Sequence, residues 1–103
     1  MPYAVEMSDW ALDFIDKHVT RETVFARIEW AIDILGEYPA FGPSYEPGYA
    51  AARPPFPCRY LPLSDTPFTL YYIKDDESKK VTIIDIEWSA GDPLKRFAGM
   101  PGF

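Results

Sequence analysis

The chain has 103 residues, of which 48% are hydrophobic and 17% aromatic, and its formal net charge is −6. This apolar content excludes a disordered chain and predicts a single packed domain over residues 1–103, because the length leaves no room for a second core. Sixteen acidic against ten basic residues argue against general binding to nucleic acid or anionic membranes, since both require clusters of Lys and Arg.

The sequence also indicates a cellular compartment. Cys58 is the only cysteine, so an internal disulfide cannot form and reducing conditions are expected. No basic segment precedes an apolar run near the N-terminus, and no apolar stretch reaches the length of a membrane span. We therefore expect a cytoplasmic protein that does not enter the membrane.

The N-terminal third predicts one strand and two helices. A short strand is predicted by alternation at Tyr3, Val5 and Met7. Ser8 is a favourable N-cap for a helix that extends to about His18, and Thr20 is expected to cap a second helix that Gly36 ends. The apolar positions of the second helix recur at helical spacing: Val24, Phe25, Ile28, Ala31, Ile32 and Leu35. The two helices are expected to pack as an antiparallel pair.

A long loop is predicted over residues 37–57, because the stretch "EYPAFGPSYEPGYAAARPPFP" contains six prolines, which lack an amide donor. A loop of this length within a compact domain is typical of a functional segment. Its aromatic residues favour packing of the loop onto the domain: Tyr38, Phe41, Tyr45, Tyr49 and Phe56.

Three strands are predicted after the loop, over residues 58–64, 68–74 and 80–88, and their short connections indicate an antiparallel meander. Strict alternation assigns one face to the helices: Leu61, Leu63, Phe68, Leu70, Tyr72, Thr82, Ile84, Ile86 and Trp88. The opposite face then carries Cys58, Tyr60, Thr69, Tyr71, Ile73, Val81, Ile83, Asp85 and Glu87. The predicted fold class is α+β, with two antiparallel helices on one face of a four-stranded, mainly antiparallel sheet in the order β-α-α-β-β-β.

This order of elements resembles the RelE/ParE toxin superfamily of bacterial toxin–antitoxin modules, the plasmid-stabilisation type. The resemblance covers roughly residues 3–93 and rests on "FTLYYIKDDESKKVTIIDI", "EWSAGDP" and the helix ending "IDILGEYP". It implies an antitoxin protein as partner. The resemblance also implies two branches of activity, one that cleaves mRNA and one that acts on gyrase without nuclease residues.

The sequence departs from the mRNA-cleaving branch. That branch uses Arg, Lys, His or Tyr on the open sheet face to hold phosphate and transfer protons. Thr69 stands where many members have Arg, and "WSAG" at 88–91 stands where His and Arg are common. Asp85 and Glu87 would repel a phosphate. We therefore expect no nuclease activity; if it is retained, the catalytic candidates are Arg59, Tyr60 and Tyr71.

The preferred interpretation is a toxin-like protein that acts by binding another protein. Tyr60 and Tyr71 are expected to present their rings on the open face, where tyrosine is a favourable interface anchor. The predicted partner-binding residues are Tyr60, Thr69, Tyr71, Asp85 and Glu87. Aromatic anchors beside carboxylates suit a protein segment bearing Lys or Arg. The alternatives are a RelE-type endoribonuclease and a non-toxin domain that mediates protein interaction or forms a homodimer through the loop.

The remaining polar residues indicate structural roles, and we expect no metal and no cofactor. Asp85 and Glu87 share a face without a third ligand, which favours a solvated sheet surface over a metal site. His18 is expected to interact with the dipole at the end of its helix, and Cys58 to be a structural thiol. Surface charges, rather than an anion site, are favoured for the basic residues near the sheet: Arg53, Arg59, Lys95 and Arg96.

Overall fold

Two helices and four strands follow one another in the predicted order in the computed structural model, which describes residues 2–46 and 57–91. The elements are β1 (Ala4–Met7), α1 (Asp9–His18), α2 (Glu22–Glu37), β2 (Arg59–Pro62), β3 (Phe68–Asp75) and β4 (Lys80–Trp88). The predicted α+β class is confirmed. Predictions that concern Arg53, Lys95, Arg96 and residues 47–56 lie outside the described residues.

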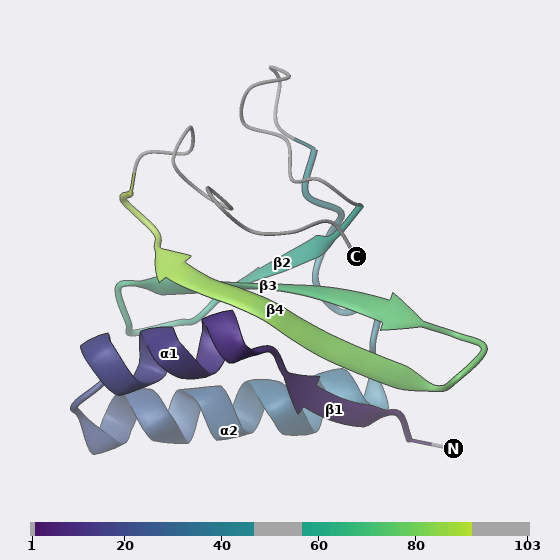
Figure 1. Ribbon diagram of the computed structural model, residues 1–103, viewed down its shortest axis with the longest axis horizontal. Helices are drawn as coiled ribbons and strands as arrows, with labels where there is room; N and C mark the ends of the chain where they lie inside the picture. The colour runs from purple at the N-terminus through teal and green to yellow at the C-terminus, as the bar shows by residue number, and fades with distance from the viewer. Residues whose placement is uncertain (1, 47–56, 92–103) are drawn as a thin grey trace.

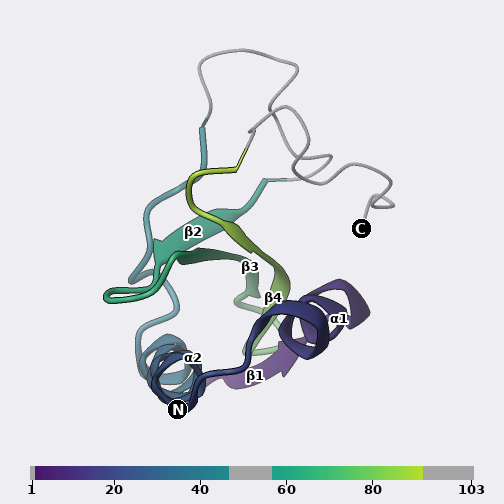
Figure 2. The same cartoon turned by 90° about the vertical axis from the view of Figure 1, so that its left-hand side faces the viewer.

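The four strands form one mixed sheet in the order β1-β4-β3-β2. β3 is antiparallel to both of its neighbours, whereas β1 is parallel to β4. The antiparallel helices α1 and α2 both cover the same face of this sheet, as two perpendicular views show (Figures 1 and 2). The opposite face is therefore not covered by a helix of the described chain. Neither of these two helices is long and apolar enough to cross a membrane.

The two helices begin differently. Ser8 caps α1 as predicted, because its hydroxyl accepts a 3.2 Å hydrogen bond from the Ala11 amide, and it also donates to the Ile84 carbonyl at 2.6 Å. The prediction that Thr20 caps α2 is wrong. The N-cap is Arg21, whose side chain makes no capping hydrogen bond, while its carbonyl accepts hydrogen bonds from the Val24 and Phe25 amides.

Gly36 is buried within α2, which continues to Glu37, so this glycine does not end the helix. Its amide group lies against the N-terminal strand: the Gly36 carbonyl accepts a 2.8 Å hydrogen bond from the Tyr3 amide. A Cβ at position 36 would lie 3.3 Å from the Tyr3 carbonyl oxygen, which is closer than most such contacts. The glycine therefore serves the close approach of α2 to the start of β1.

A β-bulge in β4 changes the alternation of its side chains. Tyr71 pairs with Asp85 but Tyr72 pairs with Ile83, which leaves Ile84 as an extra residue in β4. A bulge of this kind reverses the alternation on one side of the extra residue. The predicted faces are therefore wrong for residues 81–84. Val81 and Ile83 join the core beneath the helices, whereas Ile84 packs with Tyr71 and Cys58 on the other face.

The described part of the loop runs beside the edge strand β2. Ser44 forms an isolated bridge with Arg59. The Tyr45 amide donates to the Cys58 carbonyl at 2.9 Å, and the Tyr60 amide donates to the Pro43 carbonyl at 3.1 Å. Of the three described aromatic residues predicted to pack onto the domain, Tyr45 does so, on the helix-free face, whereas Tyr38 and Phe41 are exposed.

Candidate functional site

The helix-free sheet face brings together the five residues predicted to bind a partner. Tyr60 on β2 is the register partner of Tyr71 on β3, which in turn pairs with Asp85 on β4. Thr69 on β3 pairs with Glu87 on β4. The five residues therefore form two adjacent rows across three strands. The prediction that they share one face is consistent with this register. The extra residue of the bulge is Ile84, which precedes Asp85, so the alternation from Asp85 to Glu87 is unchanged.

Tyr45 from the loop covers part of this face, a contact that sequence reasoning missed. Its ring centroid lies 5.1 Å from that of Tyr71 and 5.8 Å from that of Tyr60, with both pairs edge to face. Tyr71 is only 1% exposed, because it packs with Cys58 and Ile84 and is contacted by Tyr45 and Tyr60. The expectation that Tyr71 presents its ring to solvent is therefore wrong. Tyr71 is buried, whereas Tyr45 and Tyr60, which contact it, are half-buried. The aromatic composition of the loop was the available signal.

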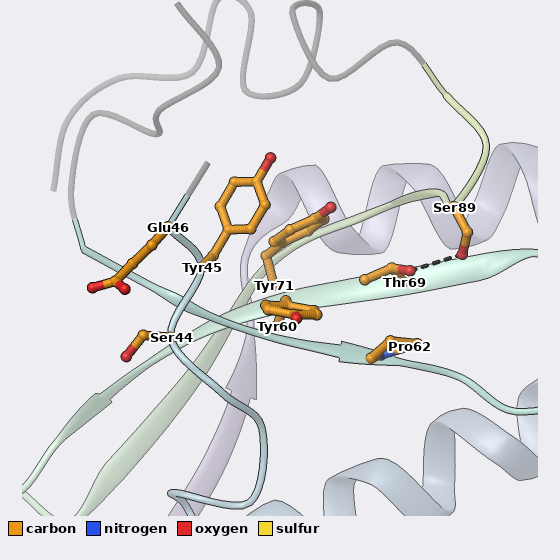
Figure 3. A pocket seen from close by; sticks show the side chains of 8 residues that line it. All are labelled: Ser44, Tyr45, Glu46, Tyr60, Pro62, Thr69, Tyr71 and Ser89. Atoms are coloured by element: carbon orange, nitrogen blue, oxygen red, sulfur yellow. Dashed lines mark hydrogen bonds between the residues drawn. The ribbon is translucent and has the colours of Figure 1, made fainter. Parts of the chain in front are cut away.

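An open hollow of about 460 Å³ adjoins the three tyrosines (Figure 3). Its described lining is Ser44, Tyr45, Glu46, Tyr60, Pro62, Thr69, Tyr71 and Ser89. The hydroxyls of Thr69 and Ser89 share a 2.7 Å hydrogen bond at one side of the hollow. Among these lining residues there is one carboxylate, Glu46, and no Lys, Arg or His. The hollow thus combines aromatic rings, hydroxyls and negative charge.

Two further carboxylates lie on the same face. Asp85 is 6% exposed, and its Oδ1 accepts a 3.0 Å hydrogen bond from the Ile86 amide. Glu87 is half-buried on the outer side of the Thr69 row. Within residues 2–46 and 57–91 there is no group of three His, Cys, Asp or Glu side chains arranged to hold a metal ion.

Arg59, a catalytic candidate from the sequence, is not brought to Tyr60 and Tyr71. Its register partner is Tyr72, which belongs to the core beneath the helices. The Arg59 guanidinium donates to the Gly42 carbonyl at 2.7 Å and lies 3.5 Å from the Ala40 carbonyl. Adjacent residues in a strand face opposite ways, so the position of Arg59 next to Tyr60 already indicated this separation. Arg59 thus holds the described part of the loop against β2 through these two carbonyl groups.

Cys58 and His18, for which the sequence predicts structural roles, lie outside the lining of the hollow. Cys58 is buried, and this burial raises the pKa of its thiol from 9.0 to about 12, which makes it a poor nucleophile. His18 contacts the rings of Phe14 and Trp88, with centroid distances of 4.7 and 5.7 Å. It lines a separate hollow between the helix connection and the end of β4.

The chain resembles known proteins in its structure, whereas comparison of its sequence finds no match. No family model and no curated protein matches the sequence. The structure matches the RelBE2 toxin–antitoxin complex of Mycobacterium tuberculosis with a TM-score of 0.64 and 22% identity, over 88% of this chain and 95% of the matched one. It matches the archaeal RelE–RelB complex of Pyrococcus horikoshii with a TM-score of 0.65 and 13% identity, over 89% and 100%.

A third match is an arginine-to-alanine double mutant of Escherichia coli toxin RelE in the free state, with a TM-score of 0.66 and 19% identity. This match covers 91% of our chain and 90% of that chain. Since these matches extend over most of both chains in each pair, the chain has the fold of RelE toxins. The fold implied by the resemblance in the sequence is confirmed.

Proposed function

We propose that the chain is the toxin-like component of a toxin–antitoxin pair and that it acts by binding proteins, an antitoxin first among them. The observation that carries this proposal is the helix-free face of a RelE fold, which presents Tyr45, Tyr60, Glu46 and Glu87 in its described part. Half-buried tyrosines supply contact area at a low entropic cost, which suits a protein interface. Antitoxins accompany the RelE chains of two of the matched structures, which supports the choice of partner.

The endoribonuclease alternative receives less support from the geometry. Catalysis at a phosphate needs cationic groups to stabilise the charge of the transition state. The hollow has no such group in its described lining, and Arg59 donates to loop carbonyls instead. Tyr60 and Tyr71 remain the candidates for this alternative, but Tyr71 is buried beneath Tyr45. We propose the protein-binding activity in preference.

Expression in a bacterial host tests the proposal. The chain is induced alone and together with the product of each reading frame that flanks its gene. We expect arrested growth with the chain alone, rescue by one of these products, and co-purification of the two proteins. Co-purification without any effect on growth would instead favour an interaction domain without toxin activity. Cleavage of mRNA on ribosomes that is lost in Arg59→Ala or Tyr60→Phe would favour the endoribonuclease.

A further inference from the structure

A second hollow, of about 480 Å³, lies where β1 passes into α1, and we call it the Trp10 hollow. Its described lining comes from these two elements and from β3 and β4. Three large apolar side chains contribute to it: Met7 and Ile73, which are half-buried, and Trp10, which is 42% exposed. The Trp10 ring makes no aromatic or cation–π contact within residues 2–46 and 57–91. Much of a large apolar ring therefore faces solvent beside a concave surface.

The polar groups around the Trp10 hollow have interactions of their own. Glu6 and Lys80 form an ion pair, with 2.9 Å between the carboxylate and the ammonium. Asp9 lies in the first turn of α1, where the positive end of the helix dipole stabilises a carboxylate. The Ser8 hydroxyl caps α1 and also donates to a carbonyl of β4. Because these groups are already stabilised, the described lining favours an apolar ligand over a charged one.

The Trp10 hollow belongs to the helix-free face. Thr82 on β4 pairs with Glu6 on β1 and with Ile73 on β3, so one row of the sheet crosses the hollow. Ile73 packs with the buried cluster that contains Tyr71 and Ile84. That cluster lies on the side of the sheet away from the helices, under the tyrosines of the candidate site.

The two hollows lie toward opposite edges of the sheet. The hollow beside Tyr60 and Tyr71 adjoins β2, whereas the Trp10 hollow adjoins β1, and β4 and β3 lie between these edge strands. Three strand spacings of about 4.8 Å give a separation of about 14 Å between the edges. An extended segment of about five residues spans this distance. A protein segment that crosses the helix-free face can therefore place side chains at both hollows.

We propose that the Trp10 hollow receives one aliphatic side chain of the protein partner, such as Leu, Ile or Met, and that Trp10 is a second anchor of the interface. A volume of about 480 Å³ falls within the range of small ligand sites, roughly 300–1,000 Å³. Tryptophan is enriched among the residues that carry most of the energy of protein interfaces, because it buries a large apolar area. The inference rests on the proposed function, since it extends the same interface from β2 to the start of α1.

Calorimetry with the flanking gene product that co-purifies with the chain tests this anchor. Trp10→Ala should weaken binding about tenfold or more, because truncation of a buried interface anchor commonly has an effect of this size. Trp30→Ala is the matched control, since Trp30 is 38% exposed on α2 and contacts Phe41 instead. It should change the affinity less than about twofold. Circular dichroism checks that both variants fold. Unchanged affinity in Trp10→Ala, or equal losses in the two variants, would overturn the inference.

Fluorine NMR gives a second readout, with the chain labelled with 5-fluorotryptophan. The signals of the three tryptophans, Trp10, Trp30 and Trp88, are assigned with single Trp→Phe variants. Binding of the same partner should shift the Trp10 signal, because its ring passes from water into an apolar contact, and should leave the Trp30 signal in place. A Trp10 signal that does not move when the chain is saturated with partner would contradict the proposal.

A small probe tests the hollow without a partner. N-acetyl-leucine amide is added to the isotope-labelled chain to about 50 mM, and shifts are followed by NMR, since binding of a single side chain is expected in the millimolar range. N-acetyl-asparagine amide, which is polar but nearly the same shape, is the comparison probe. We expect shifts centred on Met7, Trp10 and Ile73 with leucine, and several-fold weaker binding of asparagine. Equal responses, shifts centred elsewhere, or no response would show that the hollow is not an apolar site.

The outcomes separate this inference from the proposed function. If a flanking gene product binds the chain but neither Trp10→Ala nor the Trp10 signal responds, the second anchor is wrong and the proposed function stands. If the leucine probe binds as expected but the chain neither arrests growth nor binds a flanking product, the apolar site stands and the toxin–antitoxin role is wrong.

Discussion

The Tyr72 hydroxyl accepts a buried 2.8 Å hydrogen bond from the Gly42 amide, thirty positions earlier in the chain. Tyr72 belongs to β3 and lies in the core beneath the helices, whereas Gly42 belongs to the loop that carries Tyr45. The same loop is held by Arg59 through the Gly42 carbonyl. The shape of the candidate site thus depends on contacts made on the other side of the sheet.

Removal of the Tyr72 hydroxyl should destabilise the chain. Tyr72→Phe keeps the ring in the core but leaves the buried Gly42 amide without this acceptor, which typically costs about 1–3 kcal/mol of unfolding free energy. Urea denaturation followed by circular dichroism measures the change. Tyr38→Phe is the control, since Tyr38 is 63% exposed, and it should change stability by less than about 0.5 kcal/mol. Equal stability of the two variants would show that the bond does not hold the loop.

Gly42→Ala should displace the loop. A Cβ at this position would overlap the Tyr60 carbonyl oxygen, a backbone atom that cannot move aside cheaply. Overpacking of this kind costs about 1–3 kcal/mol, and the shift should separate the ring of Tyr45 from that of Tyr71. Loss of nuclear Overhauser contacts between the two rings would report the displacement. Ser44→Ala, two residues away and exposed, should preserve those contacts; their persistence in Gly42→Ala would contradict this account.

The bulge in β4 places Ile84 on the helix-free face, whereas simple alternation assigns it to the face covered by the helices. Ile84 is fully buried beside Tyr71, and Ile84→Ala should lower the unfolding free energy by about 2–4 kcal/mol. Thr82 is half-buried, and Thr82→Ala should cost less than about 1 kcal/mol. Because Ile84 lies under the tyrosines, its truncation should also shift the ring signals of Tyr45, which a residue beneath the helices would not do. Unchanged Tyr45 signals would place Ile84 on the helix side.

Cys58 gives a prediction about pH. Burial raises the pKa of its thiol from 9.0 to about 12, so the folded chain holds this proton more tightly than the unfolded chain. This contribution to stability is present below the unfolded pKa and is lost as pH rises from about 9 towards 12. At pH 8, alkylation by iodoacetamide, followed by mass spectrometry, should be much slower in the folded than in the urea-unfolded chain. Equal rates would show that the thiol is accessible.

The fold could be predicted because local signals agreed with tertiary packing. The period of α2 from Val24 to Leu35 indicates one buried face, and Ser8 has the chemistry of a cap. β3 is buried on both faces from Phe68 to Tyr72, and its apolar, aromatic composition was the signal that predicted a strand. The cap of α2 was misplaced because Arg21 begins that helix with backbone hydrogen bonds alone.

The candidate site could be predicted only in part. Tyr60 and Tyr71 are paired as expected, since their register follows from the short turn between β2 and β3. A bulge has no signature in a run of Val and Ile, so the faces of residues 81–84 could not be assigned from alternation. The contact of Tyr45 with Tyr71 joins residues far apart in the chain, and no local pattern encodes it.

Binding of the flanking gene product that co-purifies with the chain, measured by calorimetry over a range of salt concentrations, tests the central claim most directly. Tyr60→Ala should weaken binding by about 30-fold, since loss of a central aromatic anchor commonly costs about 2 kcal/mol. Glu87→Gln should mainly flatten the salt dependence. Tyr71→Ala is unsuitable because Tyr71 is buried and its truncation would disturb the fold. Unchanged affinity in Tyr60→Ala, together with weakened binding in the helix-side control Tyr38→Ala, would contradict the account.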